Sequence, residues 1–195
     1  LGLLQSRQDV RDMLGLNGYI DLIIPRGSNA FVQYIMNNTS IPVLGHADGI
    51  CHVYVDKDAD IAEAVRIVTD SKAQYVSVCN AAETLLVHRD IAAEALPKIA
   101  KSLNDAGVTI VGCRETCGII AVQPASEEDW KTEYLDYKIS VKIVGSAREA
   151  VEHINRYGSG HTDAIVTKNA QTAEYFMDAV DSANVYWNCS TRFAD

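Results

Sequence analysis

The sequence predicts an α/β fold with a largely parallel sheet. Short apolar runs alternate along the chain with amphipathic segments of helical period, which is the pattern of strands joined by crossover helices. Several of these runs are continuously apolar, as expected of strands that are buried on both faces. Hydrophobic residues make up 48% of the 195 residues and charged residues 22%, the usual values for a globular domain.

The first 45 residues contain fewer elements than the rest. Residues 6–16 predict a short helix with Ser6 as its N-cap. Residues 20–24 predict a buried strand that ends in a turn at 25–28, because they form a compact apolar run before Pro and Gly. We expect a helix at 31–36 and a brief strand at 41–44.

The remainder of the chain continues the alternation. Strands are predicted at 51–55, 83–87, 108–111, 139–144, 164–167 and 184–187. Helices are predicted at 59–72, 91–106, 147–157 and 172–180, the second of them ending at Gly107. The segment 123–137 is polar and aromatic, and we expect it to be irregular.

Charge and cysteine usage exclude several classes of protein. The net charge is −9, which disfavours a nucleic-acid surface. No apolar stretch approaches the roughly 20 residues that span a bilayer, so we expect no membrane association. An odd number of dispersed cysteines indicates reduced thiols in the cytoplasm and no metal site; they are Cys51, Cys79, Cys113, Cys117 and Cys189.

Cys79 is the candidate nucleophile. It lies between a predicted helix and a predicted strand, and Asn80 and two alanines follow it. Small neighbours let a substrate and backbone N–H groups approach the sulfur, as covalent thiol catalysis requires. The residues alone are equally compatible with a buried thiol that only fills space. No histidine partner is evident, because His88 lies beyond the next strand.

Polar clusters in the turns are the other candidates for ligand binding. We expect them at the carboxyl ends of strands, where open α/β sheets bind ligands. Arg26-Gly27-Ser28 opens a predicted helix and suits a phosphate, although a capped turn has the same pattern. Residues 158–162 could close over an anion or form an ordinary helix end. Arg192 beside Thr191 could bind a carboxylate or lie on the surface.

Taken together, four stretches resemble the γ-glutamyl phosphate reductases of the aldehyde dehydrogenase superfamily. They are residues 41–56, 78–88, 153–167 and 187–193, and they follow the family's order across essentially the whole chain. The resemblance implies an aldehyde-dehydrogenase-like, three-layer α/β fold with a mostly parallel sheet. It predicts that residues 1–45 are the end of a truncated, Rossmann-like NADP-binding domain, and that residues 46–195 are the catalytic thiol domain without its C-terminal tail.

The resemblance also implies an activity: NADPH-dependent reduction of L-glutamyl 5-phosphate to the semialdehyde, through a thioester on Cys79. Glu133 matches the superfamily's glutamate at the nicotinamide ribose, and Arg26, Gly27 and Ser28 match the turn near the cofactor phosphates. We expect the substrate to meet a set of polar side chains, namely Asn80, Ser159, His161, Thr162, Thr191 and Arg192.

One departure from the superfamily bears on the chemistry. Hydrolytic members carry a water-activating Glu near Leu44-Gly45, whereas residues 44–49 here read Leu-Gly-His-Ala-Asp-Gly. The resemblance further implies a homo-oligomer at full length, associated with glutamate 5-kinase as a separate protein or as a fusion. Two alternatives remain open. One is an acylating aldehyde dehydrogenase with another acyl donor, although Asn80, Glu83 and the cluster 159–162 favour a glutamyl substrate. The other is a catalytically silent fragment.

Overall fold

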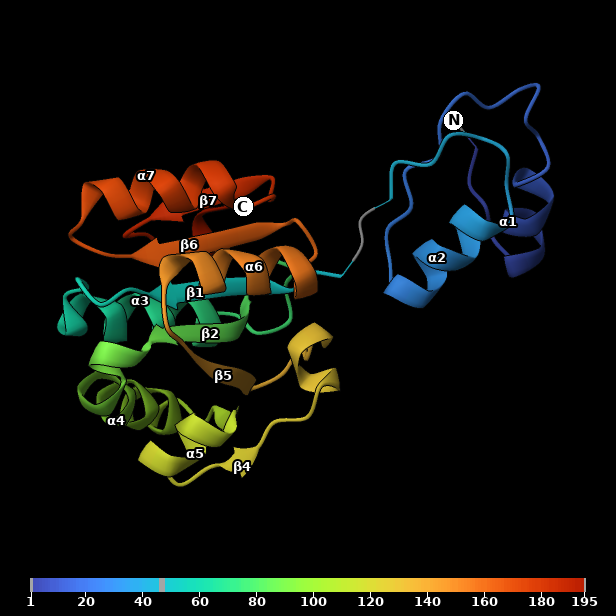
Figure 1. Cartoon of the computed structure of the whole chain (residues 1–195). Helices are drawn as coiled ribbons and strands as arrows, with labels where there is room; N and C mark the ends of the chain where they lie inside the picture. The colour runs from blue at the N-terminus through green and yellow to red at the C-terminus, as the bar shows by residue number, and fades with distance from the viewer. Residues whose placement is uncertain (1, 46–47, 195) are drawn as a thin grey trace. The chain divides into compact units, whose positions relative to one another are not determined.

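A computed structural model describes residues 2–45 and 48–194 (Figure 1). The chain divides into two compact units, Leu1–Asp48 and Gly49–Asp195, close to the division predicted from the sequence. The assignment of the first unit to a cofactor domain and of the second to a catalytic domain stays a prediction.

The first unit contains two helices, both predicted. Helix α1 (Arg7–Met13) starts at Ser6, whose hydroxyl accepts from the Asp9 N–H, while the Asp9 carboxylate accepts from the Ser6 N–H. This reciprocal capping satisfies two donors that a helix start leaves unpaired. Helix α2 (Asn29–Asn37) begins after Ser28. The small core of this unit consists of Leu14, Ile23, Ile35 and Ile41.

The strands predicted at 20–24 and 41–44 are wrong. The two segments meet only in an isolated parallel bridge between Ile23 and Val43. Leu22 and Ile24 are 48% and 59% exposed, whereas Ile23 is buried, so the apolar run is not a strand buried on both faces. An apolar run of this length does not by itself distinguish a strand from an extended connection.

The second unit is built on one seven-stranded parallel sheet. The strand order is β4-β3-β5-β2-β1-β6-β7, and each neighbouring pair runs parallel. The strands are β1 (Cys51–Val55), β2 (Ala82–His88), β3 (Thr109–Gly112), β4 (Gln123–Pro124), β5 (Lys138–Val144), β6 (Thr162–Val166) and β7 (Asn184–Trp187). The predicted parallel sheet is therefore confirmed, and β4 is an added edge strand of two residues that the sequence did not predict.

Helices cover both faces of this sheet and complete the three layers (Figure 1). Helices α3 (Ile61–Ala73) and α4 (Arg89–Asp105) share one apolar cluster with Val53 and Val55. Helices α6 (Ala147–Tyr157) and α7 (Ala170–Ala179) share the other with Tyr54. Adjacent residues of β1 thus serve opposite layers, as the alternation of side chains along a strand requires.

Three short helices complete the unit. Helix α5 (Arg114–Ile119) is too short to show a helical period and was not predicted; the 3₁₀ helices are η1 (Glu128–Lys131) and η2 (Thr191–Ala194). None of the helices in the described parts of the chain is long and apolar enough to cross a membrane.

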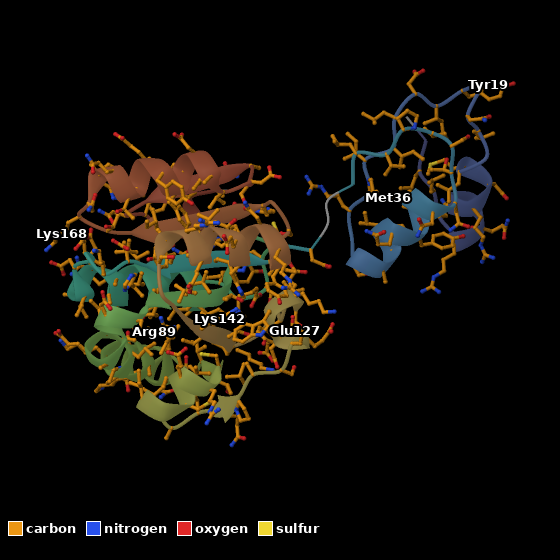
Figure 2. The ribbon with its side chains drawn as sticks, in the orientation of Figure 1. Tyr19, Met36, Arg89, Glu127, Lys142 and Lys168 are labelled. Atoms are coloured by element: carbon orange, nitrogen blue, oxygen red, sulfur yellow. The ribbon has the colours of Figure 1, made fainter. Side chains whose placement is uncertain are left out.

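The crossover helices return the chain to the side of the sheet where every strand begins, which we call the amino edge. The strands end at the opposite side, the carboxyl edge. Figure 2 shows the two edges, with Lys168 just after the carboxyl end of β6 and Glu127 at the opposite edge. Residues 158–161 precede β6, which begins at Thr162, and Gly49 precedes β1, so both clusters lie at the amino edge. The carboxyl-edge position predicted for them is wrong. The residues of these two clusters come just before strands, whereas Thr191 and Arg192 come after β7.

The acid stability of the protein is expected to depend on His153. Its ring packs against Trp130, Tyr157 and His52, and its Nδ1 lies 3.1 Å from Lys142 Nζ. Burial, helped by the neighbouring cations, lowers the pKa of His153 to about 2. Neutral His153 is therefore favoured in the folded state, and its contribution to stability is complete above the unfolded pKa of about 6.5.

Below that pH the contribution is lost at up to about 1.4 kcal/mol per pH unit, because only the unfolded chain takes up the proton. Denaturant unfolding at several pH values between 7.5 and 5 should show this slope, and His153→Phe should make it shallower. An unchanged slope in the variant would place the acid sensitivity elsewhere.

Candidate active site

Cys79 lies in the turn that joins α3 to β2, at the amino edge of the sheet. Its thiol is free and half-buried, and Ala81 and Ala82 after it are fully buried. His88 lies at the far end of β2, where its Nδ1 accepts from the Asp90 N–H at the start of α4. His88 is therefore not a partner of Cys79, as expected from its position beyond the strand.

Gly49, the last residue of the segment 44–49 that departs from the superfamily, lies directly against the Cys79 backbone. A Cβ atom added to it would lie 1.9 Å from the Cys79 carbonyl oxygen, so only glycine fits there. The Gly49 N–H donates to Glu133 Oε1 at 2.8 Å. The predicted cofactor residue Glu133 is thus bound to the residue that touches the predicted nucleophile.

Cys51 completes this contact from the first residue of β1. Its Sγ donates to the Cys79 carbonyl oxygen at 3.2 Å and lies 3.9 Å from His161 Nδ1. Burial, with the Asp163 carboxylate adding to it, raises the pKa of Cys51 well above its ordinary value. Neutral Cys51 is therefore favoured, and its thiol binds the backbone of Cys79, the predicted nucleophile.

The turn before β6 reaches the same place. Ser159 Oγ accepts from the Ile50 N–H at 2.9 Å, and His161 Nδ1 lies 2.8 Å from Thr162 Oγ1. Thr162 is fully buried and Ser159 and His161 are half-buried. The fold thus brings Cys79, Glu133, Ser159 and His161 together around residues 49–51.

Asn80 and Thr191 are buried and have atoms without partners. Within the described residues, Asn80 Oδ1 and Thr191 Oγ1 are buried with no hydrogen-bond partner. Thr191 N donates to Ser71 Oγ at 3.2 Å, and Arg192 Nε donates to Gln74 Oε1 at 3.0 Å, which places η2 against the end of α3. Their role in substrate binding stays a prediction.

The predicted phosphate turn lies in the first unit. Gly27 has a φ of 149°, and Ser28 Oγ accepts from the Phe31 N–H at the start of α2. The prediction that this turn opens a helix is confirmed. No acidic residue lies in the first turn of α2, which suits an anionic group at that helix end. Its contact with a cofactor stays a prediction.

A buried ion pair beside Cys79 was also missed by the sequence analysis. Lys72 Nζ on α3 lies 2.5 Å from Glu83 Oε2 on β2, and both side chains are fully buried. Burial raises the pKa of Glu83 to about 7 and lowers the pKa of Lys72. Glu83 therefore contacts Lys72 and cannot serve as evidence for a glutamyl substrate. The signal in the sequence that could have revealed this pair was Glu83, a charged residue inside the predicted strand 83–87.

Two further expectations concern the same region. Across residues 2–45 and 48–194, no group of three or more His, Cys, Asp or Glu side chains could hold a metal ion. The segment 44–49, which has no glutamate in the sequence, includes His46 and Ala47, and these two lie outside the described residues.

Several proteins with known names are similar in sequence to this chain along its whole length. A protein named gamma-glutamyl phosphate reductase from Acetivibrio thermocellus is 64% identical over 193 residues, which are 99% of this chain and 45% of that protein. The one from Pelotomaculum thermopropionicum is 60% identical over all 195 residues. The chain is related to the γ-glutamyl phosphate reductases along its whole length. The resemblance seen in the sequence is thereby confirmed, although no protein-family model matches the chain.

Solved structures agree with this relationship. The crystal structure of gamma-glutamyl phosphate reductase from Thermotoga maritima has a TM-score of 0.95 and 44% identity, covering 97% of this chain and 46% of that one. An acetylating aldehyde dehydrogenase from Geobacillus thermoglucosidasius, 18% identical with a TM-score of 0.72, shares the fold. The predicted aldehyde-dehydrogenase-like fold is confirmed. The chain spans about 45% of the length of the curated relatives it matches.

Proposed function

We propose that this chain supplies the nucleophile of an NADPH-dependent γ-glutamyl phosphate reductase, which converts L-glutamyl 5-phosphate to L-glutamate 5-semialdehyde for proline biosynthesis. One observation carries the proposal: the half-buried Cys79 thiol lies in a turn that Gly49 and Cys51 contact, and Glu133, Ser159 and His161 contact residues 49, 50 and 51 in turn. Relatives that are 60% and 64% identical have this name.

Cys79 would act as the covalent carrier of the acyl group. Its thiolate attacks the acyl phosphate carbon, the C–O bond to phosphate breaks, and phosphate leaves with the bonding electrons. The Cys79 N–H, which donates no hydrogen bond within the described residues, would help to hold the developing oxyanion. After reduction of the thioester, the thiohemiacetal on Cys79 collapses to the aldehyde and releases the thiolate.

A bound nicotinamide cofactor supplies the hydride for that reduction. Glu133 would contact its ribose, since one carboxylate oxygen of Glu133 is held by the Gly49 N–H beside Cys79. Arg26, Gly27 and Ser28 would contact its phosphates, because the start of α2 combines the positive end of a helix with a preceding arginine and no acidic residue in its first turn.

The substrate and its surroundings follow from the same proposal. Ser159, His161 and Thr162 would face the glutamyl group from the turn before β6, and Asn80, Thr191 and Arg192 would complete the set. The segment 44–49 carries no glutamate that could activate water, which suits a thioester that must not hydrolyse. We further propose a cytoplasmic homo-oligomer at full length that associates with glutamate 5-kinase.

The test runs the reaction in reverse with the full-length enzyme. Glutamate semialdehyde, inorganic phosphate and NADP⁺ should together produce NADPH, and omission of phosphate should abolish turnover. Turnover that continues with coenzyme A in place of phosphate would favour an acylating dehydrogenase with another acyl donor. No turnover with either acceptor would favour a catalytically silent protein.

A further inference from the structure

The buried ion pair between Lys72 and Glu83 is not explained by its contribution to stability. Both side chains are fully buried, and Lys72 Nζ lies 2.5 Å from Glu83 Oε2. Removing two charges from water is costly, and apolar residues of similar volume often stabilise a protein as well or better. The geometry of the second carboxylate oxygen indicates what the pair does instead.

Glu83 Oε1 accepts from the Leu135 N–H at 3.2 Å. The Leu135 carbonyl oxygen accepts from Ser77 Oγ at 3.4 Å. Leu135 has a φ of 51°, a left-handed conformation that a leucine adopts only when its surroundings hold it there. Both backbone polar groups of Leu135 are therefore tied to residues that flank Cys79 in the sequence.

Leu135 lies two residues after Glu133 in the same loop. Glu133 accepts from the N–H of Gly49, and Gly49 lies against the Cys79 carbonyl. Tyr134, between them, is fixed from the other side by its hydroxyl, which lies 2.7 Å from Asp129 Oδ1. The loop that carries Glu133 is thus attached to the Cys79 turn at two places, through Gly49 and through Leu135.

We propose that Glu83 is a positioning residue that holds the loop of Glu133 against the Cys79 turn, with Lys72 as the counter-ion that allows its carboxylate to be buried. This rests on the proposed function, in which Glu133 contacts the nicotinamide ribose and Cys79 carries the thioester. Lys72 offsets the charge of the Glu83 carboxylate at one oxygen, and the other oxygen accepts from the Leu135 N–H. Loss of that acceptor would release the cofactor contact while leaving the nucleophile in place.

The test compares two variants of the full-length enzyme that differ at one position. Lys72→Met/Glu83→Leu removes both charges and the acceptor for Leu135. Lys72→Met/Glu83→Gln also removes both charges but keeps an oxygen that can accept from the Leu135 N–H. We expect the Leu variant to raise KM for NADPH about tenfold or more and to lower kcat, and the Gln variant to stay within about threefold of the parent.

Modification of Cys79 by iodoacetamide serves as a readout that loop position should not move, and it is expected to be within about twofold of the parent in both variants. Equal kinetics in the Leu variant and the parent, with both proteins folded, would overturn the proposal. Equal losses in the Leu and Gln variants would overturn it as well, since the acceptor would then be irrelevant.

If the Leu variant does not fold, Ser77→Ala decides, because Ser77 is exposed and, among the described residues, its hydroxyl donates only to the Leu135 carbonyl oxygen. It should raise KM for NADPH by a few fold without changing thermal unfolding, and an unchanged KM would overturn the proposal. Failure of the proposed function looks different: there, a Cys79→Ser enzyme keeps its turnover, whatever the Lys72 and Glu83 variants do.

Discussion

Replacing Cys79 with serine is expected to lower turnover of the full-length enzyme by at least about 1,000-fold, while the protein stays folded. A serine hydroxyl is not ionised near neutral pH and needs a base to become a nucleophile. His88 cannot supply one, because it caps α4 at the opposite end of β2. His161 is bound to Thr162 and lies beside the Cys51 thiol.

The matched control is Cys117→Ser. Cys117 is also half-buried, and its Sγ donates to the Gly112 carbonyl oxygen at 3.4 Å, a bond that a hydroxyl can replace. We expect its turnover to be unchanged. Alkylation with iodoacetamide should modify Cys79 well before the buried Cys51, and loss of turnover should follow the modification of Cys79. Turnover that survives in Cys79→Ser would remove this residue from the mechanism.

Replacing Gly49 with alanine is expected to lower kcat by about 100-fold. The new Cβ would lie 1.9 Å from the Cys79 carbonyl oxygen and 2.5 Å from its Cα, and no side-chain rotation can relieve a clash with backbone. The Cys79 turn or the start of β1 must therefore shift. A displacement of about 1 Å at a reacting group is enough for a loss of this size.

Gly118→Ala is the control for this variant. Gly118 lies within α5, where an added Cβ meets nothing within 4 Å. This substitution is expected to leave turnover unchanged and to stabilise the protein by roughly 0.5–1 kcal/mol, because alanine is favoured over glycine inside helices. Steady-state kinetics and thermal unfolding of both variants provide the measurement. A Gly49→Ala enzyme within about threefold of the parent would show that the close approach to Cys79 is dispensable.

The sequence by itself determined the longer helices and strands of the second unit and the candidate nucleophile, but not β4 or α5. Apolar runs such as residues 51–55 and 139–144 coincide with β1 and β5, since strands buried on both faces leave a continuous apolar signal. Cys79 stood out because small residues follow it, and the family resemblance then separated it from four other thiols. The strand predicted at 20–24 was wrong because an apolar run alone does not reveal whether partner strands exist.

Only the tertiary structure decided what surrounds Cys79. Gly49, Glu83 and Leu135 are far apart in the sequence or carry no motif, and their roles arise from backbone contacts that no local pattern encodes. The position of the candidate site at the amino edge was likewise decided by topology, because the strands are parallel and Gly49, Cys79 and Ser159 all lie just before a strand begins. Local periodicity records which face of an element is buried, whereas a site depends on which chain ends meet, and that is a property of the whole fold.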